Sequence, residues 1–172
     1  GTGSTAVGRF ALGAQNFTSA TNAYNTAVGF NAGVAVTTGV NNTFVGGLAG
    51  DGTDDGDENV AIGYLALSGN CGNNNTAIGS QTLRDCTGAN NTTLGRTAGL
   101  GVTSGSNNLF LGVDAGRTGS PGGNITTGSN EIVLGDDNIT EAHIQVDWTV
   151  ASDQRDKTDF TALDLGLDFV KA

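Results

Sequence analysis

The sequence predicts an all-β fold, a parallel β-solenoid, from three observations. A short phrase of the form Asn-Thr-Ala-Val-Gly returns eight times between residues 4 and 135, with its glycines 16 to 23 residues apart. Each copy consists of β-branched, aromatic or small residues and is followed by turn formers. A repeat this short cannot bury a core by itself, so successive copies must stack on one another.

Each copy of the phrase predicts one strand of a coil. The phrases end at glycines that occupy equivalent positions: Gly8, Gly29, Gly46, Gly63, Gly79, Gly95, Gly112 and Gly135. The commonest spacing, 17 residues, suits a coil of two short strands and two turns, and the longer spacings suit loop insertions. Stacked strands lie ~4.8 Å apart, so eight coils predict a rod of about 40 Å.

Both faces of the predicted strands are apolar. The residue before each glycine is always aliphatic: Val7, Val28, Val45, Ile62, Ile78, Leu94, Leu111 and Leu134. The residue two before is nearly always apolar too: Ala6, Ala27, Phe44, Ala61, Ala77, Thr93, Phe110 and Val133. Adjacent strand residues point to opposite faces, and a thin coil has one interior. We assign the aliphatic column to that interior, so the second column needs a covering neighbour.

The neighbour that covers the second column is most simply another copy of the same chain. The sequence therefore predicts a homo-oligomer packed along its length, with a monomeric solenoid that carries one apolar side as the alternative. The formal net charge of −10 makes nucleic acid and anionic membrane surfaces poor partners. No stretch approaches the ~20 apolar residues of a membrane helix.

The densest acidic run, Asp51–Glu58, invites a calcium site. It partly follows the pattern of an EF-hand loop, but the twelfth position is Ile62 and the bidentate acid is missing. We expect a solvated acidic loop, no metal and no cofactor. Asp54, Asp55 and Asp57 would be the ligands if a metal bound.

The two cysteines occupy nearly equivalent positions on neighbouring coils. Cys71 and Cys86 lie eight and nine residues before Gly79 and Gly95. Stacking would bring them near disulfide range, so the sequence leaves a free pair and an intrachain bond both open. Two cysteines and the distant His143 supply too few ligands for zinc.

The phrase Asn-Thr-Ala-Val-Gly-x-x-Ala-Gly resembles the head repeats of trimeric autotransporter adhesins and similar repeats of phage tail fibres. The resemblance covers roughly residues 1–135. It implies a homotrimer of left-handed parallel β-rolls, which agrees with the oligomer expected from the strand faces.

The C-terminal residues resemble a second family. Ser152-Asp-Gln-Arg-Asp-Lys157 is similar to the opening of the intramolecular chaperone domain of peptidase S74 type, found at the ends of phage tail fibres. That family trimerises a fibre and then cleaves itself. The resemblance implies Ser152 as nucleophile and Lys157 as general base, with cleavage between Ala151 and Ser152. The alternative is that Ser152 only caps the following segment.

The residues that follow predict a short C-terminal helix. An apolar stripe at helical spacing consists of Leu163, Leu167 and Val170. We accordingly divide the chain into a repeat shaft (1–137), a linker strand (138–151) and the start of a chaperone domain (152–172).

The function expected is that of a tail-fibre segment of a phage particle, working in host attachment. Its partners would be two further copies, other tail-fibre proteins and a host surface glycan or protein, and self-cleavage would be its only catalysis. The contact loops expected are Thr18–Tyr24, Asp51–Glu58 and Thr118–Thr127. The alternatives are a trimeric adhesin head on a bacterial surface and an ice-binding solenoid. The latter rests on an interrupted threonine column: Thr5, Thr26, Thr43, Thr76 and Thr92.

Overall fold

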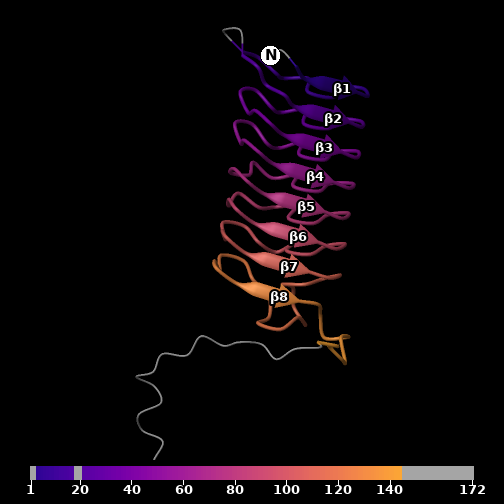
Figure 1. The fold of residues 1–172 in the computed structure, drawn as a ribbon, viewed down its shortest axis with the longest axis vertical. Coiled ribbons are helices and arrows are strands. Elements are labelled where there is room, and N and C mark those ends of the chain that lie inside the picture. The colour runs from indigo at the N-terminus through magenta and orange to yellow at the C-terminus, as the bar shows by residue number, and fades with distance from the viewer. Residues whose placement is uncertain (1–2, 18–20, 145–172) are drawn as a thin grey trace, which may run out of the picture. The chain divides into compact units, whose positions relative to one another are not determined.

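The structure, a computed structural model, describes residues 3–17 and 21–144. Eight strands form one parallel sheet in sequence order (Figure 1). The strands are β1 (Thr5–Val7), β2 (Thr26–Val28), β3 (Thr43–Val45), β4 (Val60–Ile62), β5 (Thr76–Ile78), β6 (Thr92–Leu94), β7 (Leu109–Leu111) and β8 (Ile132–Leu134). The prediction of an all-β parallel solenoid is confirmed, and no helix occurs among the described residues.

The register of the sheet places equivalent repeat positions side by side. Thr26 pairs with Thr43, and Val28 pairs with Val45. The same pairing continues through every neighbouring pair of strands, so each repeat position becomes a column along the solenoid. In the described residues each coil contributes one three-residue strand, not the two expected. Turns and loops make up the rest of the coil.

The prediction of which strand face is buried was wrong. The middle residue of the strand points inward: Ala27, Phe44, Ala61, Ala77, Thr93 and Phe110 have no exposed surface. The aliphatic column points outward, with 39% of Ile62 and 53% of Leu94 exposed. The interior of the coil is too narrow to hold a large side chain from every wall. The middle column, whose residues range from alanine to phenylalanine, fits this interior, whereas the uniformly large aliphatic column does not.

Volume is matched across the interior of the solenoid, within a coil and between neighbouring coils. Phe44 lies against Gly33 and Gly50, and a Cβ added to Gly50 would come within 2.4 Å of the Phe44 ring. Where the middle residue is Ala61, the position equivalent to Gly50 holds the buried Leu67. Phe110 repeats the first arrangement with Gly99 and Gly116, and Ala77 repeats the second with Leu83. Native packing density requires such exchange of large for small residues.

The glycine that ends each strand is required by close stacking. Gly46 has φ +135°, and a Cβ there would lie 2.6 Å from the carbonyl oxygen of Gly63. Gly63 has the same relation to Gly79 at 2.5 Å. Any larger residue would push consecutive coils apart, which explains why this column is glycine in every copy.

A ladder of buried asparagines joins the coils at the N-terminal ends of the strands, opposite the strand-ending glycines. Its members are Asn25, Asn42, Asn59, Asn75, Asn91 and Asn108. The Oδ1 of Asn75 accepts a hydrogen bond from the backbone N–H of Asn91 at 3.0 Å, and its Nδ2 donates to the Gly88 carbonyl at 3.0 Å. The final step runs from the Glu131 N–H to Asn108 Oδ1 at 3.0 Å. The ladder satisfies buried backbone groups that the three-residue strands leave unpaired.

Candidate functional surface

The outward face of the sheet carries an apolar stripe along the coils. Its members, called here the aliphatic stripe, are Val7, Val28, Val45, Ile62, Ile78, Leu94, Leu111 and Leu134. Six of them are exposed and the other two, Ile78 and Leu111, are half-buried. Because the strands pair in register, these side chains form one row along the sheet. The sequence pointed to an apolar face in need of a partner but placed it on the wrong column.

Exposed residues of the adjoining turn widen the aliphatic stripe. Phe30 and Tyr64 follow the strand-ending glycines of their coils and are 50% and 53% exposed. Val113 holds the equivalent place after β7, the second-last strand of the sheet, and is also exposed. A monomer rarely leaves so extended a row of apolar side chains in water, so this surface has the character of an interface.

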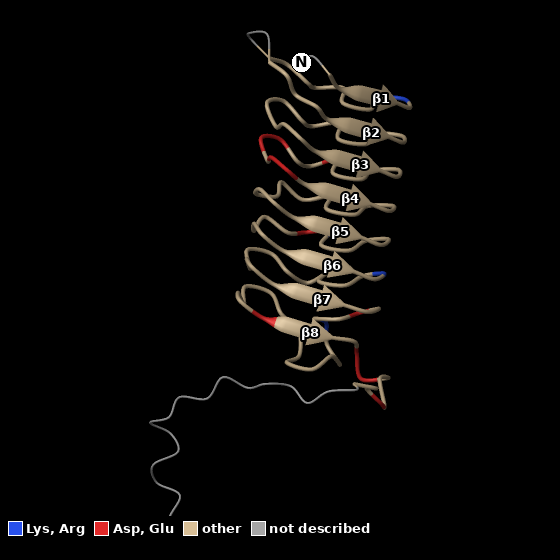
Figure 2. Ribbon diagram, viewed as in Figure 1, with Lys and Arg blue, Asp and Glu red and all other residues tan. Residues whose placement is uncertain are grey.

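No strand residue is charged, although Glu131 directly precedes β8. Figure 2 shows acidic residues in the loops and basic residues at turns, and all strand residues are uncharged. At one turn Asp114 accepts hydrogen bonds from Thr97 Oγ1 and Arg117 Nη1, and Arg96 lies 3.4 Å away. The Thr97 hydrogen bond and then the two arginines hold the pKa of the Asp114 carboxyl below its ordinary value. The strand residues of the sheet face can be covered without desolvating a charge, whereas the turn position of Phe30 and Tyr64 is held by the exposed Arg9 and Arg96 in their own coils.

Side chains of the acidic run, Asp51–Glu58, form hydrogen bonds with the preceding coil. Thr37 Oγ1 donates to Asp54 Oδ1, and the Val40 N–H donates to Asp57 Oδ1 at 2.8 Å. Asp55 is exposed. Among residues 3–17 and 21–144, no group of three or more Asp, Glu, His or Cys side chains has an arrangement that could hold a metal ion.

The two cysteines are free thiols buried in the interior. Thr53 Oγ1 lies 3.1 Å from the Cys71 sulfur, and Asn91 Nδ2 lies 3.6 Å from the Cys86 sulfur. Burial raises the pKa of Cys71 to about 11 and raises that of Cys86 as well. The contribution of the two protonated thiols to the stability of the fold is fully present below the thiol pKa of the unfolded chain, ~8.5. It is lost as the pH rises through the folded-state value.

We expect both thiols to react slowly with a soluble disulfide reagent while the chain is folded. At a pH near 8.5 an ordinary cysteine is about half ionised, but the buried thiols remain protonated and shielded. The measurement is a thiol titration in buffer and then in guanidinium chloride, where two thiols per chain should react at once. Rapid reaction of both thiols in buffer would contradict the buried interior column.

The expected catalytic residues lie outside the described residues. This applies to Ser152 and Lys157 and to the expected C-terminal helix. Of the expected contact loops, Thr118–Thr127 is folded inward at one point, because Ile125 is buried and its N–H donates to the Gly116 carbonyl. In the part of the chain that the structure describes, no helix has the length and apolar character needed to cross a bilayer.

Comparison of the chain with protein-family models, with curated proteins and with solved structures gives no match in any of the three.

Proposed function

We propose that this chain is a shaft segment of a homotrimeric viral tail fibre that contributes to host attachment. The observation that supports this function best is the aliphatic stripe. It follows the sheet of a solenoid whose strands are otherwise suited to indefinite stacking, and it leaves apolar side chains exposed on coil after coil. A shaft needs such a row, because association along its whole length stiffens it.

The partner that fits the aliphatic stripe best is another copy of this chain. The stripe repeats once per coil, so a covering surface needs apolar groups at the same ~4.8 Å spacing over the same length. A second parallel solenoid meets that requirement by construction. Closed rotational symmetry around a shared axis lets three stripes cover one another and leaves the loops outside.

The resemblance to head repeats and to the chaperone junction supports the viral assignment. On this proposal the trimer is of the left-handed β-roll kind, the protein works in the virion, and Ser152 and Lys157 perform self-cleavage after Ala151. Its partners are other tail-fibre proteins and a host surface glycan or protein. A trimeric adhesin head on a bacterial surface would share the shaft and would lack the cleavage.

Native mass spectrometry tests the proposal, and we expect a trimer. Val45→Lys combined with Ile62→Lys should give a folded monomer, because both side chains are exposed in one chain and charges would be buried in the assembly. The matched control, Ser104→Lys with Thr126→Lys, adds the same charge at exposed loop positions and should remain trimeric. Circular dichroism confirms that each variant is folded.

A monomeric parent chain would contradict the fibre proposal. An ice-binding solenoid needs the whole sheet face bare, the threonine column and the aliphatic stripe together, because Thr26 and Thr43 share this face with the stripe. A monomer would favour that function, and a trimer that covers the stripe would exclude it. The denatured mass, measured on the complete reading frame, reports self-cleavage. Chains that end at Ala151, and that stay whole in Ser152→Ala, support the chaperone junction.

A further inference from the structure

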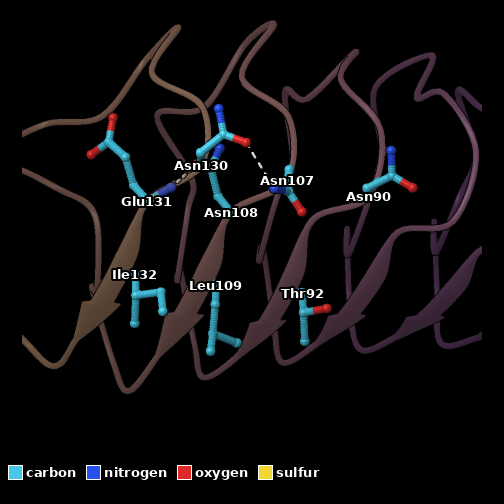
Figure 3. Close-up of a pocket in the computed structure, with 8 residues that line it drawn as sticks. All are labelled: Asn90, Thr92, Asn107, Asn108, Leu109, Asn130, Glu131 and Ile132. Atoms are coloured by element: carbon cyan, nitrogen blue, oxygen red, sulfur yellow. Dashed lines mark hydrogen bonds between the residues drawn. The ribbon is translucent and has the colours of Figure 1, made fainter. Parts of the chain in front are cut away.

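A groove on the outer surface of the last three coils has the features of a small polar binding site. It encloses about 300 Å³ beside the N-terminal ends of β6, β7 and β8. Figure 3 shows three amide side chains, from Asn90, Asn107 and Asn130, on the loop side of this groove. Thr92, Leu109 and Ile132 lie on the strand side.

The amides along this groove are exposed and only partly used. Asn107 Nδ2 donates to Asn130 Oδ1 at 2.8 Å, which leaves Asn107 Oδ1 and Asn130 Nδ2 open. Among the described residues, the Asn90 side chain has no hydrogen-bond partner. Neighbouring coils thus offer one open acceptor on Asn107 and one open donor on Asn130. The Asn90 amide can both donate and accept.

The strand side of the groove offers apolar contact. Ile132 is 65% exposed and Leu109 is half-buried. Glu131 takes the place that asparagine holds in the ladder and lines the groove, with its carboxylate beside Gly128. The combination of a few directed polar groups with apolar side chains is usual for small-molecule sites, and the volume is at the lower end of their range.

We propose that this groove binds a neutral sugar unit of a glycan. Sugar hydroxyl groups both donate and accept, as the open amides require. The C–H face of a pyranose ring can rest on Leu109 and Ile132, the first residues of β7 and β8, which lie on the loop side of the aliphatic stripe. The site therefore requires that the contact between chains be confined to the aliphatic stripe in these coils. An anionic sugar is disfavoured, because Glu131 lines the groove and the chain carries a net charge of −10. The inference rests on the proposed host-attachment function and names the class of ligand for it.

Glycine variants test the groove without disturbing the backbone. Asn107 and Asn130 have φ of +58° and +65°, which glycine adopts freely. The variant Asn107→Gly with Asn130→Gly removes both amides. The matched control is Asn41→Gly with Asn74→Gly, since these exposed asparagines hold the same column position with φ of +60° and +61° but lie outside the groove.

The experiment is saturation-transfer difference NMR with maltotriose, mannotriose, N,N′-diacetylchitobiose and, as the anionic probe, sialyllactose. We expect the parent chain and the control to bind at least one neutral probe, and the groove variant to bind it about tenfold more weakly or not at all. Equal binding by the groove variant and the control would overturn the assignment. So would binding of sialyllactose alone, or of no probe.

Failure of the groove and failure of the fibre proposal give different results. None of these asparagines belongs to the aliphatic stripe, so all variants should keep the oligomeric state of the parent chain in native mass spectrometry. A trimer without sugar binding would overturn only the groove, whereas a monomer that binds through Asn107 and Asn130 would overturn only the fibre assembly.

Discussion

Phe44→Ala should lower the free energy of unfolding by about 3–5 kcal/mol, the loss usual for a buried phenylalanine. Phe44 is fully buried and fills the space left by Gly33 and Gly50, so its removal opens a cavity that neighbouring coils cannot close. Gly50→Leu should also destabilise the chain strongly, because its Cβ alone would come within 2.4 Å of the Phe44 ring. Guanidinium unfolding at one fixed protein concentration measures both.

The double variant Phe44→Ala with Gly50→Leu should be more stable than either single change predicts. It recreates in the third coil the pairing of Ala61 with Leu67 in the fourth. The backbone suits it, because Gly50 has φ +59° and Leu67 has φ +52°. We expect a favourable coupling of about 1–3 kcal/mol between the two changes.

Gly47→Ala is the control for these substitutions. A Cβ at Gly47 would meet only the Tyr64 ring, at 3.7 Å, and φ there lies outside the left-handed region. Its effect should stay within about 1 kcal/mol. Additive losses in the double variant would show that volume is not exchanged across the coil in the way described above.

Asn75→Ala should lower the free energy of unfolding by about 1–3 kcal/mol. It leaves the buried Asn91 N–H without a partner, and such an orphaned group costs roughly 1–3 kcal/mol. The Gly88 carbonyl loses the Asn75 amide but keeps the hydrogen bond that it accepts from the Gly72 N–H at 3.1 Å. Because the ladder runs through neighbouring coils, the loss lies in the middle of the solenoid and cannot be relieved by fraying at an end. Thermal and guanidinium unfolding both report it.

Asn75→Asp separates the two halves of the amide. The carboxylate can still accept from the Asn91 N–H, but it faces the Gly88 carbonyl where Nδ2 had donated. Burial raises the pKa of such a carboxyl in the folded chain, so this variant should gain stability as the pH falls and the protonated group becomes a donor. The control Asn90→Gly removes an exposed amide at the adjoining left-handed position and should change stability by no more than about 1 kcal/mol. Equal losses of unfolding free energy in Asn75→Ala and Asn90→Gly would show that the asparagine ladder does not stabilise the fold.

The repeat alone predicted the architecture, because a phrase returning at near-constant spacing gives every coil the same local preferences. The strands occur where the phrases are, and Val28 lies beside Val45 because both precede a glycine. The presence of an apolar face that one coil cannot cover also followed from the sequence, since both faces of each strand are apolar. Ser152 and Lys157 remain expectations, because they lie outside the described residues.

Only the tertiary structure decided which face is inside and what the polar columns do. Alternation along a strand separates Phe44 from Val45 but does not say which of them faces the core. That choice depends on the width of the coil and on Gly33 and Gly50, which come from other parts of the chain. Likewise, Asn75 looks like a turn residue until the next coil supplies the Asn91 N–H as its partner. A sequence pattern specifies periodic local preferences, whereas packing and hydrogen bonding depend on partners that folding alone brings together.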